Sequence, residues 1–313
     1  MTTPAIETRA LTKKYGRTTA LSAIDLSVTA GSVFGVIGPN GAGKTTTMRL
    51  LLDIIRPTSG EVRVLGRDPR TGGKELRREI GFLPGELRLE GRVTGRSLLD
   101  HFARISGPVE RGAIDSLAER LGLDLTRQVR TLSKGNKQKL GIVQAFMHRP
   151  KLLVLDEPTS GLDPLVQQEF LSLVREASAR GQTVFLSSHV LSEIQQAADA
   201  VAILRAGRVV SVSDVESLRL TAVRRVRARI AGVASAVRAV LATVPHLAEL
   251  GTLDDTADAD GQTTVTATIE GDIDPLIKRL ATLTVLDLTI EEPDLEESVL
   301  RLYGIREEVP REN

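Results

Sequence analysis

One octapeptide constrains the fold of this 313-residue chain more than any other part of its sequence. It follows an apolar run over residues 33–37, which predicts a buried strand, and it precedes residues 46–52, which predict the first turns of a helix. Glycines allow the main chain to bend so that successive N–H groups point at one anion, and a helix N-terminus adds partial positive charge. The sequence therefore predicts a cradle for nucleotide phosphates, built by Gly38, Pro39, Asn40, Gly41, Ala42, Gly43, Lys44, Thr45 and the following Thr46.

Four side chains in and near this loop carry predicted chemistry. Lys44 is expected to reach the β- and γ-phosphates, and the Thr45 hydroxyl is expected to bind Mg²⁺. Asp156 and Glu157 close the apolar run over residues 152–155, at the strand end where ligands bind in open α/β sheets. Acidic residues that end a strand are more often solvated turn residues, but beside a phosphate loop we favour the functional interpretation. Asp156 is then a second Mg²⁺ ligand, and Glu157 accepts a proton from an attacking water.

Composition excludes several classes of protein. With 41 basic and 40 acidic residues the net charge is +1, which argues against a nucleic-acid coating protein, so no nucleic acid is expected as a partner. The absence of cysteine excludes disulfides, Cys-ligated zinc and a thiol nucleophile. No run of about 18 apolar residues predicts a membrane span, and the N-terminus lacks the features of a signal peptide. We expect a cytoplasmic chain that reaches a membrane through a partner.

The order of predicted elements suggests two domains. Residues up to about 210 alternate strands with helices, which predicts an α/β fold with a mostly parallel sheet. The strand pattern disappears between about 85 and 150, where apolar residues recur at helical spacing and predict a helical insertion. We expect a first domain over residues 1–218 and an accessory domain over residues 224–313.

The accessory domain has an α+β pattern of its own. Alternation near residues 226–230 and 265–269 predicts two strands, and residues 247–253 and 285–290 predict two more. One helix is expected near residue 237, and another is expected to start with Asp274 as its N-cap. The resulting βαββαβ order resembles a ferredoxin-like module, with a final helix expected over residues 294–303. Its role is open between stabilising a dimer and packing only against its own chain.

Two further loops have simple structural explanations when considered alone. Residues 132–136 precede a helical run that is expected from 139 to 148. Either Ser133 or Asn136 at this helix start is adequately explained as an N-cap. Asp163, which a proline follows, is equally well explained as the N-cap of the next helix.

The order and spacing of five motifs nevertheless resemble ABC-type ATPases over roughly the first two-thirds of the chain. The motifs are the loop at 38–45, the loop at 132–136 with Gln138 behind it, the strand end at 152–157, the turn at 160–163 and His189. The resemblance implies a P-loop NTPase fold, the ABC ATPase cassette, and it assigns a role to several other residues. These are Ser133, Gly135 and Asn136 in the signature loop, Asp163 in the D-loop, His189 as the switch histidine two residues past a strand, and Tyr15 as the ring that stacks on adenine. Tyr15 is also compatible with an ordinary half-buried ring, and a lone histidine is more often structural.

The resemblance also implies how such a protein works. Two copies sandwich two ATP molecules head to tail, because the signature helix of one copy points at the γ-phosphate held by the other. The implied cofactors are ATP and Mg²⁺, and the implied partners are a second copy and separately encoded membrane permease subunits. The protein would then lie peripherally on the inner face of the cell membrane.

This chain departs from the family pattern at two places. Gly85 occupies a position where the family usually has a glutamine that touches Mg²⁺ and the membrane partner, so water or Glu86 is the candidate substitute. Lys134 and Asn136 stand where Gly and Gln are commoner. Both changes resemble the subgroup that pairs with ABC-2-type permeases, including antibiotic-resistance and drug exporters, although the transported compound and the direction of transport are not encoded in any motif.

The alternative function is a soluble ABC ATPase that acts on ribosomes or DNA. Ribosome-acting members usually fuse two cassettes, whereas this chain has one phosphate loop. DNA-repair members carry long coiled coils or zinc-binding cysteines, and neither pattern is present. A basic run is best explained as a solvated or phosphate-facing surface; it comprises Arg127, Arg130, Lys134, Lys137 and Lys139.

Overall fold

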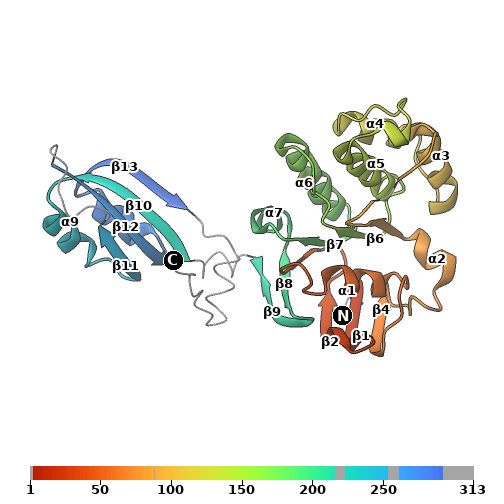
Figure 1. Ribbon diagram of the computed structural model, residues 1–313, viewed down its shortest axis with the longest axis horizontal. Helices are drawn as coiled ribbons and strands as arrows, with labels where there is room; N and C mark the ends of the chain where they lie inside the picture. The colour runs from red at the N-terminus through yellow and green to blue at the C-terminus, as the bar shows by residue number, and fades with distance from the viewer. Residues whose placement is uncertain (1–2, 88, 216–222, 253–260, 292–313) are drawn as a thin grey trace, which may run out of the picture. The chain divides into compact units, whose positions relative to one another are not determined.

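The computed structural model describes residues 3–87, 89–215, 223–252 and 261–291 (Figure 1). Its contacts divide the chain into two compact units, Met1–Val215 and Glu216–Asn313, and each unit is described by itself. Among the described residues, no helix has both the length and the apolar character that crossing a bilayer requires.

A six-stranded sheet forms the centre of the first unit, with the order β5-β6-β7-β3-β8-β9. Neighbouring strands are parallel except for the antiparallel pair β8–β9, which confirms the predicted mostly parallel sheet. Every residue of β3, β6 and β7 is buried, as expected for strands that are covered on both faces. The strands are β3 (Val33–Ile37), β5 (Ile80–Leu83), β6 (Leu152–Asp156), β7 (Thr183–Ser188), β8 (Ala200–Arg205) and β9 (Arg208–Asp214).

A second, three-stranded antiparallel sheet with the order β2-β1-β4 was not predicted. Its strands are β1 (Ile6–Tyr15), β2 (Thr18–Val28) and β4 (Ser59–Val64). The register between β1 and β2 shifts three times, and Ala10 and Ala23 have left-handed φ angles of 45° and 49°. These irregularities interrupt the two-residue alternation by which a half-buried strand is recognised. Figure 1 shows α1 (Lys44–Leu51) between this sheet and the central one, and both sheets contribute to a single buried apolar cluster.

Helices build the predicted insertion, which Figure 1 shows as the group α3, α4 and α5. α5 begins at Lys134, so the expected start at residue 139 was wrong. Ser133 is its N-cap and accepts a hydrogen bond from the Asn136 N–H at 3.2 Å. The first turns are polar and therefore carry no apolar periodicity, which is why the sequence signal started too late. The helices are α2 (Gly73–Arg78), α3 (Gly95–Ser106), α4 (Ala113–Arg120), α5 (Lys134–Phe146), α6 (Pro164–Ala179) and α7 (Leu191–Ala197).

The second unit contains a four-stranded antiparallel sheet with the order β11-β12-β10-β13. This order and the βαββαβ sequence of elements confirm the predicted ferredoxin-like arrangement. α10 begins at Asp274 with Ile273 as its cap, so the expectation that Asp274 is the N-cap was wrong. The helix expected over residues 294–303 lies outside the described residues. The elements are β10 (Val223–Ala231), α9 (Ala234–Leu241), β11 (Leu247–Thr252), β12 (Gln262–Glu270), α10 (Asp274–Leu280) and β13 (Thr284–Glu291).

Candidate functional site

The predicted phosphate loop connects the end of β3 to the start of α1. Two of its glycines are required by their surroundings. A Cβ on Gly38 would come within 2.2 Å of the Leu204 carbonyl oxygen, and a Cβ on Gly43 would come within 2.4 Å of Leu21 Cδ2. Gly43 is also the N-cap of α1 with a left-handed φ of 109°. Because this cap has no side chain, it leaves the first N–H groups of the helix open to an anion.

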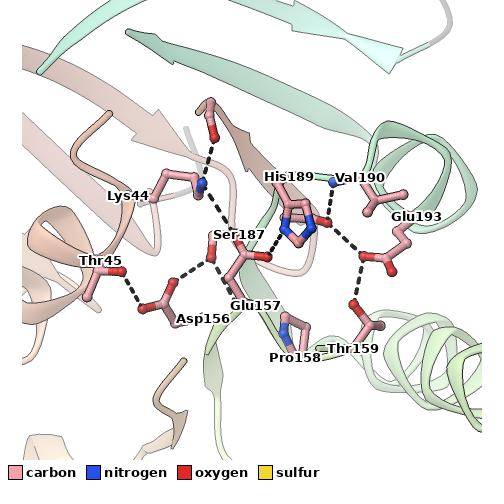
Figure 2. Close-up of polar contacts among 12 residues, drawn as sticks. Lys44, Thr45, Asp156, Glu157, Pro158, Thr159, Ser187, His189, Val190 and Glu193 are labelled. Atoms are coloured by element: carbon pink, nitrogen blue, oxygen red, sulfur yellow. Dashed lines mark hydrogen bonds and ion pairs between the residues drawn. The ribbon is translucent and has the colours of Figure 1, made fainter. Parts of the chain in front are cut away.

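Lys44 lies at the base of this loop and is only 6% exposed. Its Nζ donates to the Gly38 carbonyl oxygen at 2.6 Å and forms an ion pair with Glu157 Oε1 at 3.2 Å (Figure 2). The structure therefore brings together a loop lysine and a strand-end carboxylate that lie more than one hundred residues apart in the sequence.

Asp156 forms the second link between the loop and β6. The Thr45 hydroxyl donates to Asp156 Oδ2 at 2.7 Å, and the Ser187 hydroxyl donates to Asp156 Oδ1 at 2.6 Å (Figure 2). Ser187 Oγ also accepts the Glu157 N–H at 3.0 Å. One serine thus fixes both predicted carboxylate residues. Sequence reasoning missed Ser187, although it is the penultimate residue of a buried strand and pairs with Asp156 of the neighbouring strand.

Glu157 lies between a lysine and a histidine. Its Oε2 is 2.6 Å from His189 Nδ1, while its Oε1 faces Lys44. The residue has a left-handed φ of 47°, an uncommon conformation for a residue other than glycine and one that recurs at functional sites. Its carbonyl oxygen and that of Pro158 accept hydrogen bonds from Gln138 Nε2 at 3.3 and 3.0 Å, so α5 supports the loop after Glu157.

His189 follows β7 directly, so its expected position two residues past a strand was wrong. Ser187 and Ser188 still pair with Val36 and Ile37 of β3, and the strand therefore continues to Ser188. The His189 side chain is 60% exposed, which leaves it accessible to solvent on one side of Glu157.

The loops of the remaining motifs serve as helix caps. Asp163 Oδ1 accepts the Val166 N–H at 3.0 Å and caps α6, as Ser133 caps α5. The two loops touch, because a Cβ on Gly135 would come within 2.8 Å of the Gly161 carbonyl oxygen. Within the part of the chain that the structure describes, these cap residues are not brought into contact with Lys44 or Glu157. Tyr15 ends β1 with 48% of its surface exposed, and Lys13 Nζ lies 4.9 Å from the centre of its ring.

A cavity of about 400 Å³ adjoins the two carboxylates. Gly85 and Glu86 line it, and a Cβ at position 85 would lie 3.2 Å from Asp156 Oδ2. Gly85 therefore leaves open the space beside Asp156 into which a longer side chain would project. The cavity is lined by Asn40, Thr45, Met48, Arg49, Phe82, Pro84, Gly85, Glu86, Asp156, Glu157, Ser160 and His189.

The oxygen atoms at this site fit a hard cation such as Mg²⁺. The Thr45 hydroxyl and the Asp156 carboxylate already share a contact of 2.7 Å. The described residues contain no group of three or more acidic, histidine or cysteine side chains arranged to hold a metal by themselves. One hydroxyl and one carboxylate are donors that suit Mg²⁺, which proteins usually hold through one or two carboxylates while phosphates and water complete the shell.

The parallel sheet, the glycine loop at a helix start and the two carboxylates at the end of β6 together define a phosphate-loop nucleotide hydrolase. Comparisons with known proteins narrow this class. The family described as "ABC transporter" matches residues 21–160. The bacitracin transport ATP-binding protein BcrA of Bacillus licheniformis is 40% identical over 217 residues, which cover 68% of this chain and 71% of that protein. The daunorubicin/doxorubicin resistance ATP-binding protein DrrA of Streptomyces peucetius is 37% identical, with 69% of this chain and 67% of that protein covered.

Solved structures agree with this family. An ATP-binding subunit of an ABC transporter superposes with a TM-score of 0.64 at 29% identity, covering 69% of this chain and 92% of that chain. The dimeric cassette MJ0796 in a post-hydrolysis state has a TM-score of 0.62 at 21% identity, covering 67% of this chain and 98% of that one, which shows a shared fold. The chain therefore belongs to the ABC transporter family of ATP-binding proteins, and it binds and hydrolyses ATP.

Proposed function

We propose that this protein is the ATP-hydrolysing subunit of an exporter that moves drugs or other small molecules across a cell membrane. The observation that carries this proposal is its similarity, over about two-thirds of each chain, to proteins named for bacitracin transport and for daunorubicin resistance. In this proposal two copies work as a homodimer beneath separately encoded permease subunits, on the inner face of the membrane.

The contacts of the site residues support the roles proposed for them. The loop N–H groups at 38–45 and Lys44 would hold the phosphates, as expected where a glycine loop leads into a helix N-terminus. Thr45 and Asp156 would hold Mg²⁺, which when bound neutralises negative charge on the phosphate oxygens. Glu157 would take a proton from the attacking water at one carboxylate oxygen, and His189, 2.6 Å from Oε2, would orient that carboxylate.

The two cap loops are proposed to act across the dimer. Ser133, Gly135 and Asn136 at the start of α5, together with Asp163, would act on the nucleotide held by the second copy. The N-terminus of α5 suits this task because a helix start favours negative charge. Tyr15 would stack on the adenine ring, and its exposed ring leaves room for that contact. Glu86 or water would take the place of the missing glutamine at position 85.

The accessory unit is proposed to occupy residues 224–313, after an ATPase unit over residues 1–218. Deleting residues 224–313 and measuring the mass of the complex with and without ATP decides its role. Loss of the ATP-dependent dimer would assign it to dimer stabilisation, whereas an unchanged dimer would assign it to packing against its own chain.

A resistance and pull-down experiment tests the proposed function. The tagged chain is purified from detergent-solubilised membranes of its host, and co-purifying polypeptides are identified by mass. In parallel, a deletion strain is complemented with the wild-type gene or with Lys44→Ala and grown on bacitracin and on daunorubicin. We expect a co-purifying permease and a lower tolerance for at least one compound in the Lys44→Ala strain. Co-sedimentation with ribosomes or DNA, with unchanged tolerance, would instead support the soluble alternative.

A further inference from the structure

Glu193 is a buried carboxylate that the proposed reaction does not use. It lies in the first turn of α7, and only 8% of its surface is exposed. Among the residues that the structure describes, no lysine, arginine or histidine forms an ion pair with it. Burial of a charge without a counter-charge is costly unless hydrogen bonds compensate. The contacts of this carboxylate therefore need an explanation.

Both hydrogen bonds to Glu193 converge on one oxygen atom. Oε2 accepts from Thr159 Oγ1 at 2.8 Å and from Ser188 Oγ at 2.7 Å (Figure 2). Because the single hydroxyl proton of Ser188 is donated to Glu193, its oxygen is free to accept, and it accepts the Val190 N–H at 2.9 Å. Both donors to Glu193 are buried, with 5% of Thr159 and none of Ser188 exposed.

The two donors lie next to the proposed catalytic groups in the sequence, Thr159 in the loop after β6 and Ser188 at the end of β7. Thr159 comes two residues after Glu157, and Ser188 directly precedes His189. Figure 2 shows the resulting chain of contacts, in which Glu193 closes a ring that runs through the backbone of both loops and returns through the pair formed by His189 and Glu157. One buried oxygen atom thus joins the segments on either side of that pair.

The pair itself is poorly protected. The His189 side chain is 60% exposed, and exposed ion pairs or hydrogen bonds between mobile side chains hold their geometry weakly. Glu157 also keeps an uncommon φ of 47°. Rigidly held backbones on both sides would help to keep Nδ1 and Oε2 at their distance of 2.6 Å in such surroundings. Glu193, Thr159 and Ser188 are buried and provide that constraint.

We propose that Glu193 is a positioning residue that holds His189 against Glu157. It does not touch the reacting atoms, and it acts by fixing the distance between the two loops. This inference rests on the roles proposed above for Glu157 and His189. A purely structural role for Glu193 is the competing explanation. In that case the effect of removing Glu193 would not depend on whether His189 is present.

A double-mutant cycle in purified protein separates the two explanations. Glu193→Ala removes the shared acceptor, while Glu193→Gln keeps an oxygen that can accept both hydroxyls. We expect Glu193→Ala to lower the kcat of ATP hydrolysis about tenfold or more, because small displacements of catalytic groups have large effects on rate. KM for ATP should stay within about threefold, and Glu193→Gln should restore most of the rate. In a His189→Ala background, Glu193→Ala should change kcat by less than about twofold, because its target is already absent.

Controls keep the result interpretable. Glu119→Gln, an exposed acidic residue on α4, is the matched control and should leave kcat unchanged. If Glu193→Ala does not fold, Thr159→Val or Ser188→Ala takes its place in the same double-mutant cycle, because each removes one of the two donors to Glu193. An equal loss of kcat with and without His189, or no loss at all, would overturn the proposal. If the proposed roles themselves were wrong, His189→Ala and Glu157→Gln would each retain full activity, which is a distinguishable outcome.

Discussion

Glu157→Gln is the most informative perturbation of this site because it alters two contacts at once while keeping the size of the side chain. In the wild type, Oε1 lies 3.2 Å from Lys44 Nζ and Oε2 lies 2.6 Å from His189 Nδ1. Glutamine cannot accept a proton from water at neutral pH, and it presents one amide N–H₂ group where an oxygen stood. Proton acceptance and the attraction to Lys44 are therefore lost together.

The two losses affect different measurements. Removing a positioned proton acceptor lowers rates by about 10²–10⁴, equivalent to about 3–5 kcal/mol in the activation free energy. Removing the charge opposite Lys44, which is 6% exposed, frees the ammonium from a hydrogen-bonded ion pair worth about 1–3 kcal/mol. Phosphates then no longer compete with Glu157 for Lys44. We expect ATP to bind the variant at least as tightly as the wild type, and up to about a hundredfold more tightly.

Steady-state phosphate release gives kcat, and a fluorescent ATP analogue gives the dissociation constant. Size-exclusion chromatography with light scattering reports whether the variant accumulates as a dimer in ATP, which we expect because turnover no longer separates the copies. Glu119→Gln serves as the matched control. A kcat within tenfold of the wild type would exclude Glu157 as the base, and weaker ATP binding would show that the pairing with Lys44 does not compete with phosphates.

Three other predictions follow from contacts outside the two carboxylates. In Gly135→Ala the new Cβ would meet the Gly161 carbonyl oxygen at 2.8 Å, so we expect ATPase activity to fall at least tenfold while ATP binding persists; full activity would show that this contact is dispensable. Arg120 donates two hydrogen bonds to the Glu176 carboxylate, at 3.0 and 2.6 Å, and lysine cannot form both. In Arg120→Lys the free energy of unfolding, measured in urea at low salt, should therefore fall by about 1 kcal/mol. An unchanged value would mean that the contact is not stabilising. Burial lowers the pKa of His148 in the folded protein, so as the pH falls this histidine is protonated in the unfolded chain before it is protonated in the folded one. The free energy of unfolding should therefore fall as the pH drops below about 6.5. Thermal unfolding of His148→Gln between pH 5 and 7.5 should show a flatter pH dependence than that of the wild type, and an identical profile would exclude His148 as the cause.

The fold was predictable where local pattern and tertiary role agree. The strands at Val33–Ile37 and Leu152–Asp156 are continuous apolar runs because helices cover both faces of their sheet, and the same rule identified them in the sequence. The antiparallel sheet β2-β1-β4 was missed for the opposite reason. Its first two strands contain register shifts, and their residues alternate irregularly between buried and exposed. The start of α5 was misplaced because its first turns are polar and Ser133, rather than an apolar repeat, marks where the helix begins.

The sequence predicted many residues of the candidate site but not the contacts among them. The order of the strands in the sheet explains this difference. Asp156, Glu157 and the phosphate loop were found because each ends a strand or begins a helix in its own local sequence. Ser187 was missed because its role depends on β7 lying next to β6, an order that right-handed crossovers permit but do not require. Given that order, Ser187 near the end of β7 lies opposite Asp156 of β6 and contacts both carboxylate residues. Lateral strand order is therefore the information that turns a set of motif residues into a hydrogen-bonded site.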